Sequence, residues 1–329
     1  IIPRGCLFAR FMRAVSLLHT ARAFARPIGG RQGFTCAPPP AALTALLTGA
    51  PTVETLLRLH ERHVTAFNEV HISAFWSTLG KLTRQNRRQA SWLHDNSEAL
   101  RPAREHTSNM MPALGPRELA QTAHGAASAH VGSAPPWASW WGRLAASTLP
   151  VMDQLTHHEL NISAYAFARS RASVPAFFDG VSWQVAQRLE SLQPPQLALL
   201  AWSFSAAQHP APTLMAALAA TATPRIADFS AEQVSMLTSA FVRTETQAHD
   251  FFAALEAELP DRLRAFRPRE LSHTVLTLAR AGHSSPVLYE ALAVESIKRL
   301  GSFRAVDLAA LASGFAQAAA PHRILIAPH

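Results

Sequence analysis

Apolar residues recur along this chain with the spacing of amphipathic α-helices, and the whole pattern returns at a fixed interval. Each helical phrase has Glu, Gln or Asp in its first turn, followed directly by an apolar anchor residue. The anchors of six successive phrases are Leu119, Leu160, Leu197, Val234, Leu271 and Leu308. Their spacings are 41, 37, 37, 37 and 37 residues, which indicates a repeat architecture. Positions 0, +4, +7 and +8 from each anchor share one helix face, so each phrase predicts a helix, called helix A below.

A second apolar run follows each helix A. The runs open at Pro175, Pro212, His249 and Pro286, again 37 residues apart. Within them the same columns return, as at Val181, Leu218, Leu255 and Leu292. We call this second predicted helix of the repeat helix B. Two antiparallel helices cannot bury their apolar faces alone, so stacked neighbours must complete the core. The sequence therefore predicts an all-α fold, an α-solenoid of about 37-residue helical hairpins, right-handed by analogy with other such arrays.

The pattern divides the chain into three regions. Residues 1–53 form a basic N-terminal extension or targeting segment, and residues 54–114 form a divergent first repeat. Its helix A is HISAFWSTLGKLTRQ from His71, whereas residues 86–114 are polar and contain Pro102 and Pro112, so we expect a loop insertion there. Residues 115–329 form the array, with repeats starting near 115, 156, 193, 230, 267 and 304. Trp137, Trp140 and Trp141 are expected to pack on one helix face.

Charge is distributed unevenly along the chain. The net charge of +8 arises near the N-terminus, because residues 1–53 hold six Arg and no Asp or Glu, while residues 116–329 hold sixteen basic and sixteen acidic residues. An Arg-rich, acid-free start is typical of a transit peptide, with Phe8, Phe11, Met12 and Val15 on its apolar face. We expect mitochondrial localisation, with the plastid as alternative and a retained basic arm as a second interpretation. No membrane span is expected, because prolines interrupt the uncharged interval from Glu190 to Arg225.

Signals for catalysis are poor. The chain has no phosphate-binding Gly-rich loop, no HExxH and no nucleophile elbow. His60 and His63 lie three residues apart, but they lack further ligands at suitable spacing, so surface histidines are the favoured interpretation. We therefore expect no enzyme, no catalytic residues, no cofactor, no metal and no small-molecule substrate.

Two columns of basic residues are candidates for binding RNA. One arginine stands near the end of each helix B, at Arg188, Arg225, Arg262 and Arg299. Regularly spaced arginines can follow successive phosphates, but they also stabilise helix C-termini, and Glu270 and Asp307 are the expected acidic partners of the last two. Because the column is invariant within the array, we favour the architectural reading.

The second column lies at +9 of helix A, opposite the anchor face. It varies between repeats, as a position that touches RNA would, and four of its seven members are basic: Lys81, Arg169, Arg243 and Arg280. The competing interpretation is an ordinary solvated face. At +5, His124, Tyr165 and Trp202 could stack on bases, although packing against the next repeat is the more usual role of such aromatic residues.

The columns from Arg267 to Leu300, of the form PxELSxxxxxLAxxGHxxPxLxxALAxExxxRL, carry a family resemblance. The chain resembles the octotricopeptide and heptatricopeptide repeats, and the related leucine-rich region of FAST-kinase-like proteins, over about residues 70–319. This resemblance implies an organellar RNA-binding solenoid that acts in transcript maturation, translation or ribosome structure. Many relatives carry a RAP domain, a nuclease-like module; no such sequence follows Leu308, so the resemblance favours a scaffold or binding role.

Our interpretation of the sequence is an organellar helical-repeat protein that contacts RNA and other proteins of a ribonucleoprotein assembly. The expected setting is the mitochondrial ribosome, with rRNA or an organellar transcript as the RNA. The alternative is a protein–protein adaptor in a respiratory or ATP synthase complex, without RNA. The neutral charge of the repeats favours a scaffold over a free-standing single-strand binder, which usually shows a net basic groove.

Overall fold

The computed structural model describes residues 38–283 and 285–319, and within these ranges all regular structure is helical. Sixteen α-helices are present there, joined by short turns and 3-10 segments. They are α2 Pro40–Thr48, α3 Val53–His63, α4 Glu69–Gln85, α5 Arg87–Asp95, α6 Arg101–Met110, α7 Pro116–Ser128, α8 Trp137–Thr148, α9 His157–Ser170, α10 Pro175–Ala186, α11 Pro194–Ala207, α12 Pro212–Ala222, α13 Ala231–Arg243, α14 His249–Arg262, α15 Pro268–Arg280, α16 Pro286–Lys298 and α17 Ala305–Ala318.

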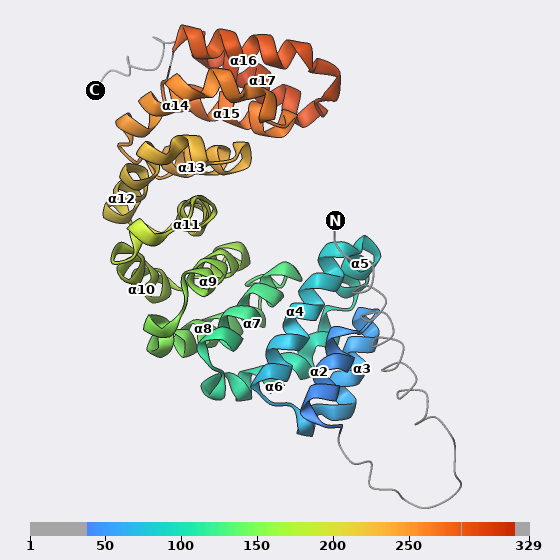
Figure 1. The fold of residues 1–329 in the computed structure, drawn as a ribbon. Helices are drawn as coiled ribbons and strands as arrows, with labels where there is room; N and C mark the ends of the chain where they lie inside the picture. The colour runs from blue at the N-terminus through green and yellow to red at the C-terminus, as the bar shows by residue number, and fades with distance from the viewer. Residues whose placement is uncertain (1–37, 284, 320–329) are drawn as a thin grey trace, which may run out of the picture. The chain divides into compact units, whose positions relative to one another are not determined.

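The helices pair as the repeat predicts. Helix A of successive units is α4, α7, α9, α11, α13, α15 and α17, and each of these packs on the next in series (Figure 1). Helix B is α8, α10, α12, α14 and α16, and the last four begin at the positions expected from the sequence. The predicted all-α solenoid of stacked helical hairpins is therefore confirmed.

A capping box explains how most A helices begin. Glu159 accepts a hydrogen bond from the main-chain N of the N-cap Thr156 at 2.9 Å, and Gln196, Gln233 and Glu270 accept equivalent bonds at 2.7–2.9 Å. An acid and an amide both supply the acceptor oxygen that an otherwise unpaired N–H needs. Hydrogen bonding, in addition to the helix dipole, thus accounts for the Glu-or-Gln column before each anchor.

The turn from helix A to helix B uses one residue in the left-handed region of backbone space. This residue is Arg171, Gln208, Glu245 and Gly282 in four successive repeats, with φ between 51° and 75°. These positions are again 37 residues apart. A left-handed residue is a common way to end a helix, because its N–H returns to the orphan carbonyls of the last turn. The chain therefore reverses through the same left-handed turn in these four repeats.

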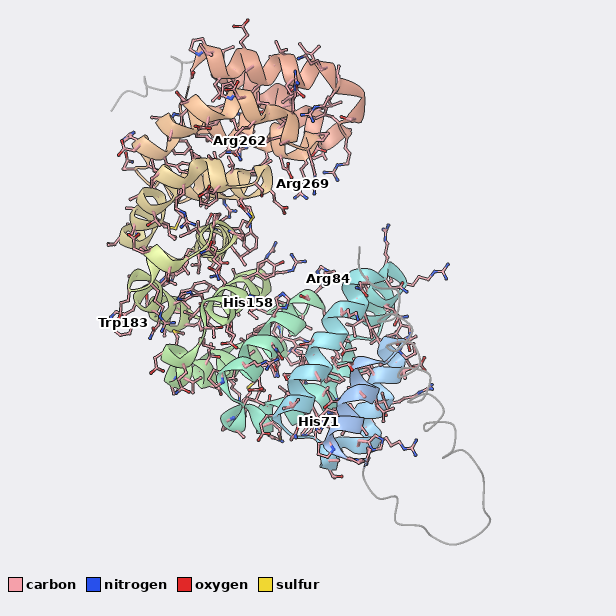
Figure 2. The ribbon with its side chains drawn as sticks, in the orientation of Figure 1. His71, Arg84, His158, Trp183, Arg262 and Arg269 are labelled. Atoms are coloured by element: carbon pink, nitrogen blue, oxygen red, sulfur yellow. The ribbon has the colours of Figure 1, made fainter. Side chains whose placement is uncertain are left out.

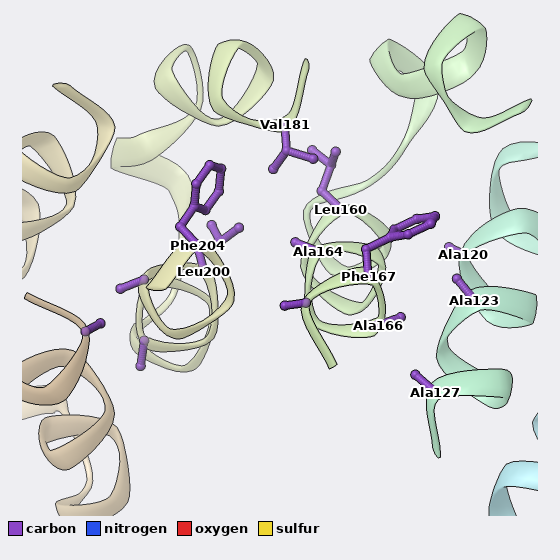
Figure 3. Packing of buried hydrophobic residues seen from close by; sticks show 14 of the residues in the cluster. Ala120, Ala123, Ala127, Leu160, Ala164, Ala166, Phe167, Val181, Leu200 and Phe204 are labelled. Carbon is purple, nitrogen blue, oxygen red and sulfur yellow. The ribbon is translucent and has the colours of Figure 1, made fainter. Parts of the chain in front are cut away.

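The core is a continuous stack of the predicted apolar columns. Val181, Leu218, Leu255 and Leu292 are 0–1% exposed. Leu160, Phe167, Leu200 and Phe204 of α9 and α11 lie in the same packed layer (Figure 3). Each such side chain contributes about 1.5–3 kcal/mol by leaving water. This burial between neighbouring hairpins holds the array together.

Two expectations for the N-terminal part were wrong. Residues 86–114 are not a loop insertion but contain α5 and α6, with Leu93, Leu100 and Met111 buried. Pro102 lies in the first turn of α6, where its missing N–H costs nothing, so it starts the helix and does not break it. Residues 38–53 belong to the folded array, because α2 packs on α4 and buries Leu43 and Leu47. Residues 1–37, which hold most of the expected targeting segment 1–53, lie outside the described residues.

The crossing of α4 and α7 is close and depends on glycine. A Cβ added to Gly125 would lie 2.4 Å from the carbonyl of Trp76, and one added to Gly80 would lie 2.6 Å from the carbonyl of Gly125. Trp76 itself is buried and donates from Nε1 to Thr107 Oγ1 at 2.9 Å. Trp140 and Trp141 are buried beside it, whereas Trp137 is half-buried. The tryptophans thus pack largely as expected.

Within the described ranges, no helix is both long enough and apolar enough to cross a membrane.

Candidate nucleic-acid interface

The A helices separate their charges along their length. Six of them carry an acidic residue in the first turn, namely Glu69, Glu118, Glu159, Glu232, Glu270 and Asp307. Four carry a basic residue in the last turn, namely Arg84, Arg169, Arg243 and Arg280. The helix dipole favours this arrangement in every helix separately. The A helices stack in the same direction, so their last turns lie along one side of the array. We call the four residues Arg84, Arg169, Arg243 and Arg280 there the basic edge. The net charge of the repeats does not reveal it, because the acidic first turns balance it.

Three of the predicted +9 residues, Arg169, Arg243 and Arg280, lie on this edge, and Lys81 lies about one helical turn before Arg84 on α4. Arg169, Arg243, Arg280 and Lys81 are exposed. Arg169 Nη2 donates to His130 Nδ1 of the preceding turn at 3.2 Å, and Arg243 Nη2 donates to the main-chain oxygen of Ser205 at 3.4 Å. These contacts orient the guanidinium groups and leave most of each group in solvent.

Hollows between neighbouring repeats accompany three of these arginines. Arg169 lines a hollow of about 260 Å³ between α7 and α9, with Leu199 of α11 at its margin. Arg243 lines a second, of about 500 Å³, beside the turn that contains Gln208. Arg280 lines a third, of about 240 Å³, beside His283. The basic edge therefore combines cations with recesses at intervals of one or two repeats.

A row of aromatic rings crosses the A helices next to the first hollow. The centroids of His124 and Tyr165 are 6.2 Å apart, and those of Tyr165 and Trp202 are 5.4 Å apart, with interplanar angles of 43° and 34°. All three side chains are half-buried. Trp202 packs on the apolar core, as the sequence suggested, whereas His124 and Tyr165 line the hollow.

Burial and nearby positive charges lower the pKa values of two histidines on the A helices. Burial lowers the pKa of His124, and the charges of Arg84 and His158 lower it further. Burial also lowers the pKa of His273, with Arg269, Arg280 and Arg243 adding to the effect. Figure 2 labels Arg84, His158 and Arg269. Charged groups from neighbouring repeats thus act on each of these two histidines.

The invariant arginine column has a different environment. Arg188, Arg225, Arg262 and Arg299 are half-buried, and each donates to the main-chain oxygen of the residue 33 positions earlier. The acceptors are Leu155, Leu192, Phe229 and Phe266, each directly before the N-cap of a helix A. We call this recurring contact the arginine clamp.

The prediction that Glu270 and Asp307 pair with Arg262 and Arg299 was wrong. Glu270 caps its own helix, and Asp307 pairs with Arg304 at 2.8 Å. The clamp reaches back to the carbonyl directly before the helix A of its own hairpin, and it does not reach forward to the acids eight residues downstream. Arg299 also contacts Glu295 at 3.1 Å, one helical turn before it. Main-chain carbonyls take one or two of the five N–H donors of each guanidinium, which supports an architectural role for this column.

His60 differs from the expected surface histidine. It is 2% exposed and bonds to His106 at 3.0 Å, with the rings of Phe67 and Phe75 beside it. Burial, and secondarily His106, lowers its pKa to about 4, so the ring is neutral at pH 7. Among the described side chains, no group of three or more His, Cys, Asp or Glu is placed to hold a metal ion.

Comparison with known families shows a match over the second half of the chain. A sequence model of the RNA-editing substrate-binding complex 6 protein family matches residues 142–319, more than half of the chain. A search of curated proteins found no significant match. The match spans α9 to α17, and with it the basic edge from Arg169 to Arg280. The chain therefore belongs to the RNA-editing substrate-binding complex 6 protein family.

Proposed function

We propose that this family member is a non-catalytic RNA-binding scaffold, which holds a single RNA strand along the basic edge while other surfaces contact neighbouring proteins. The observation that carries the proposal is the series of exposed arginines along the basic edge, each beside a hollow, with the His124 and Tyr165 rings lining the hollow at Arg169. Single-strand binders combine a cationic track with aromatic rings in this way. The name of the family, which refers to binding of RNA-editing substrates, supports the same class of function.

The assembly is also part of the proposal. The family name favours a complex that handles RNA to be edited, and the resemblance to octotricopeptide and heptatricopeptide arrays favours an organellar ribonucleoprotein. A structural role at the mitochondrial ribosome is the second setting. We propose a mitochondrial location, which the Arg-rich residues 1–53 support.

The protein–protein adaptor without RNA is the competing function. It draws on the exposed apolar side chains of the last repeat, where Val287, Ile297 and Val306 are 64–71% exposed. Such a patch suits a protein partner. The two functions are compatible on one molecule, because these residues belong to α16 and α17, away from the hollow at Arg169.

Crosslinking in organelles followed by sequencing of the attached RNA tests the proposal directly. We expect a defined set of organellar RNAs, and binding by the purified protein that weakens steeply as salt rises. Absence of crosslinked RNA, together with no salt-sensitive binding in vitro, would contradict the RNA function and favour the adaptor.

A further inference from the structure

The hollow beside Tyr165 has the features of a site for one unpaired base. Resting on the proposed RNA-binding function, we propose that the hollow lined by His124, Tyr165 and Arg169 receives a single nucleobase of single-stranded RNA, stacked on the His124 and Tyr165 rings.

Trp202 supports the Tyr165 ring from behind, so the rings form a stacking platform that is held in place. Tyr165 lies between His124 and Trp202, with centroid distances of 6.2 and 5.4 Å. Trp202 packs on the apolar core and backs Tyr165, whereas Tyr165 and His124 face the hollow. A ring that is held on one side and open on the other can stack on a base without a large loss of side-chain entropy. The platform is thus ready before RNA arrives.

Cations stand where the attached phosphates would lie. Arg84 of α4 and Arg169 of α9 both line the hollow, so positive charge flanks it from two different repeats. His130 accepts the hydrogen bond from Arg169 and fixes the orientation of its guanidinium. Burial and the charge of Arg169 lower the pKa of His130, which keeps Nδ1 free to accept this bond at neutral pH. The site thus pairs an aromatic surface with oriented phosphate-binding groups.

His124 contributes a neutral ring. Its lowered pKa means that the imidazole carries no charge at pH 7, so it offers one donor and one acceptor as well as a stacking face. A neutral ring can hydrogen-bond to a base edge, whereas a charged one would favour phosphate. The hollow therefore offers rings and hydrogen-bonding groups to a base, and Arg84 and Arg169 offer positive charge to the phosphates.

The size of the recess favours one base of a longer strand. At about 260 Å³ it is near the lower end of small-molecule sites, which begin at about 300 Å³, and it is open to solvent. A duplex keeps its bases stacked inside and cannot insert one without unpairing. Single-stranded RNA is therefore the favoured ligand.

Binding of a short fluorescein-labelled oligoadenylate tests the proposal in the full chain. Tyr165→Leu, which keeps apolar bulk but removes the ring, should weaken binding about 5- to 100-fold, the effect of one stacked base. Tyr165→Phe should bind nearly as wild type. Trp183→Ala is the matched control, because Trp183 is 65% exposed on α10 and lies outside the hollow. The same strand annealed to its complement should compete poorly.

Ultraviolet crosslinking of the wild-type complex, with mass spectrometry of the peptides, gives a second readout that does not depend on a variant folding. Crosslinks at Tyr165 or His124 support the base site. Wild-type affinity in Tyr165→Leu, or crosslinks confined to other surfaces while RNA still binds, would overturn the base site and leave the proposed function standing. No binding by the wild-type protein would overturn both and favour a protein ligand for the hollow.

Discussion

Arg169 Nη2 donates a 3.2 Å hydrogen bond to His130 Nδ1, so a side chain of one repeat is oriented by the turn of the repeat before it. His130 itself has a left-handed backbone, with φ of 60°. The bond therefore links the left-handed turn after α7 to Arg169 of the basic edge. An arginine held in this way loses less entropy when it binds a phosphate than a free one.

Charge reversal at the basic edge should weaken RNA binding without unfolding the protein. We expect Arg169→Glu, Arg243→Glu and Arg280→Glu each to lower affinity, because each removes a phosphate partner, and to reduce the salt slope by about 1. Fluorescence anisotropy across a salt series measures both quantities. Arg264→Glu, at an exposed arginine after α14, is the control. Equal losses at Arg264 and at the edge would point to non-specific electrostatics.

Removing an arginine clamp should affect stability and not RNA affinity. Arg262 donates to the main-chain oxygens of Ile226 (2.9 Å) and Phe229. We expect Arg262→Ala to destabilise the protein by about 1–3 kcal/mol, since hydrogen bonds from charged donors are lost and two carbonyls are left without that partner. Chemical denaturation measures the change. An RNA affinity that falls while the unfolding midpoint stays constant would assign this column to RNA.

Glycine substitutions separate backbone strain from steric contact. Gly282 has φ of 75° and nothing within 4 Å of an added Cβ, so Gly282→Ala should cost about 1–2 kcal/mol from the backbone alone. Gly125→Ala should cost more, because its Cβ would meet the Trp76 main chain at 2.4 Å. Gly142→Ala, in an open position of α8, should stabilise the protein by up to about 1 kcal/mol. Thermal melts rank the three, and any other order would contradict this account.

Acid should destabilise the N-terminal repeats through His60. Its folded pKa of about 4 lies below the ordinary 6.5, so the unfolded chain binds the proton first as pH falls. Stability from this group is complete above about pH 6.5 and decreases as pH falls toward 4, by at most about 3 kcal/mol. Denaturation midpoints between pH 4 and 7 measure the slope. His60→Gln should flatten it, and an unchanged slope would assign the effect to other groups.

The fold was predictable because its determinants are local and periodic. The anchor column, with Glu, Gln or Asp before it, marks the start of each helix A from α7 to α17. The N-caps stand at 115, 156, 193, 230, 267 and 304, where the repeats were expected to begin. Residues 86–114 were misread because their helices expose much polar surface and bury few side chains, among them Leu93 and Leu100. Periodicity is weak when few positions are apolar.

The site was less predictable, because it depends on contacts between repeats. The +9 arginines were identifiable as a variable column. The bond from Arg169 to His130 was not, because it joins residues 39 positions apart and no local sequence pattern indicates it. The aromatic row occupies only three repeats at +5, too few to be distinguished from core packing in sequence. The acceptors of the arginine clamp are main-chain oxygens, which every residue has, so no sequence pattern reveals them.

The arginine clamp has a consequence for how the array comes apart. Each clamp ties the end of one helix B to the carbonyl just before the helix A of the same hairpin, and Arg262 and Arg299 also reach the carbonyls of Ile226 and Leu263 in the hairpin before. A frayed unit therefore deprives its neighbour of hydrogen-bond partners as well as of apolar cover. Such nearest-neighbour coupling makes partly melted states costly, so several consecutive repeats should unfold as one cooperative block.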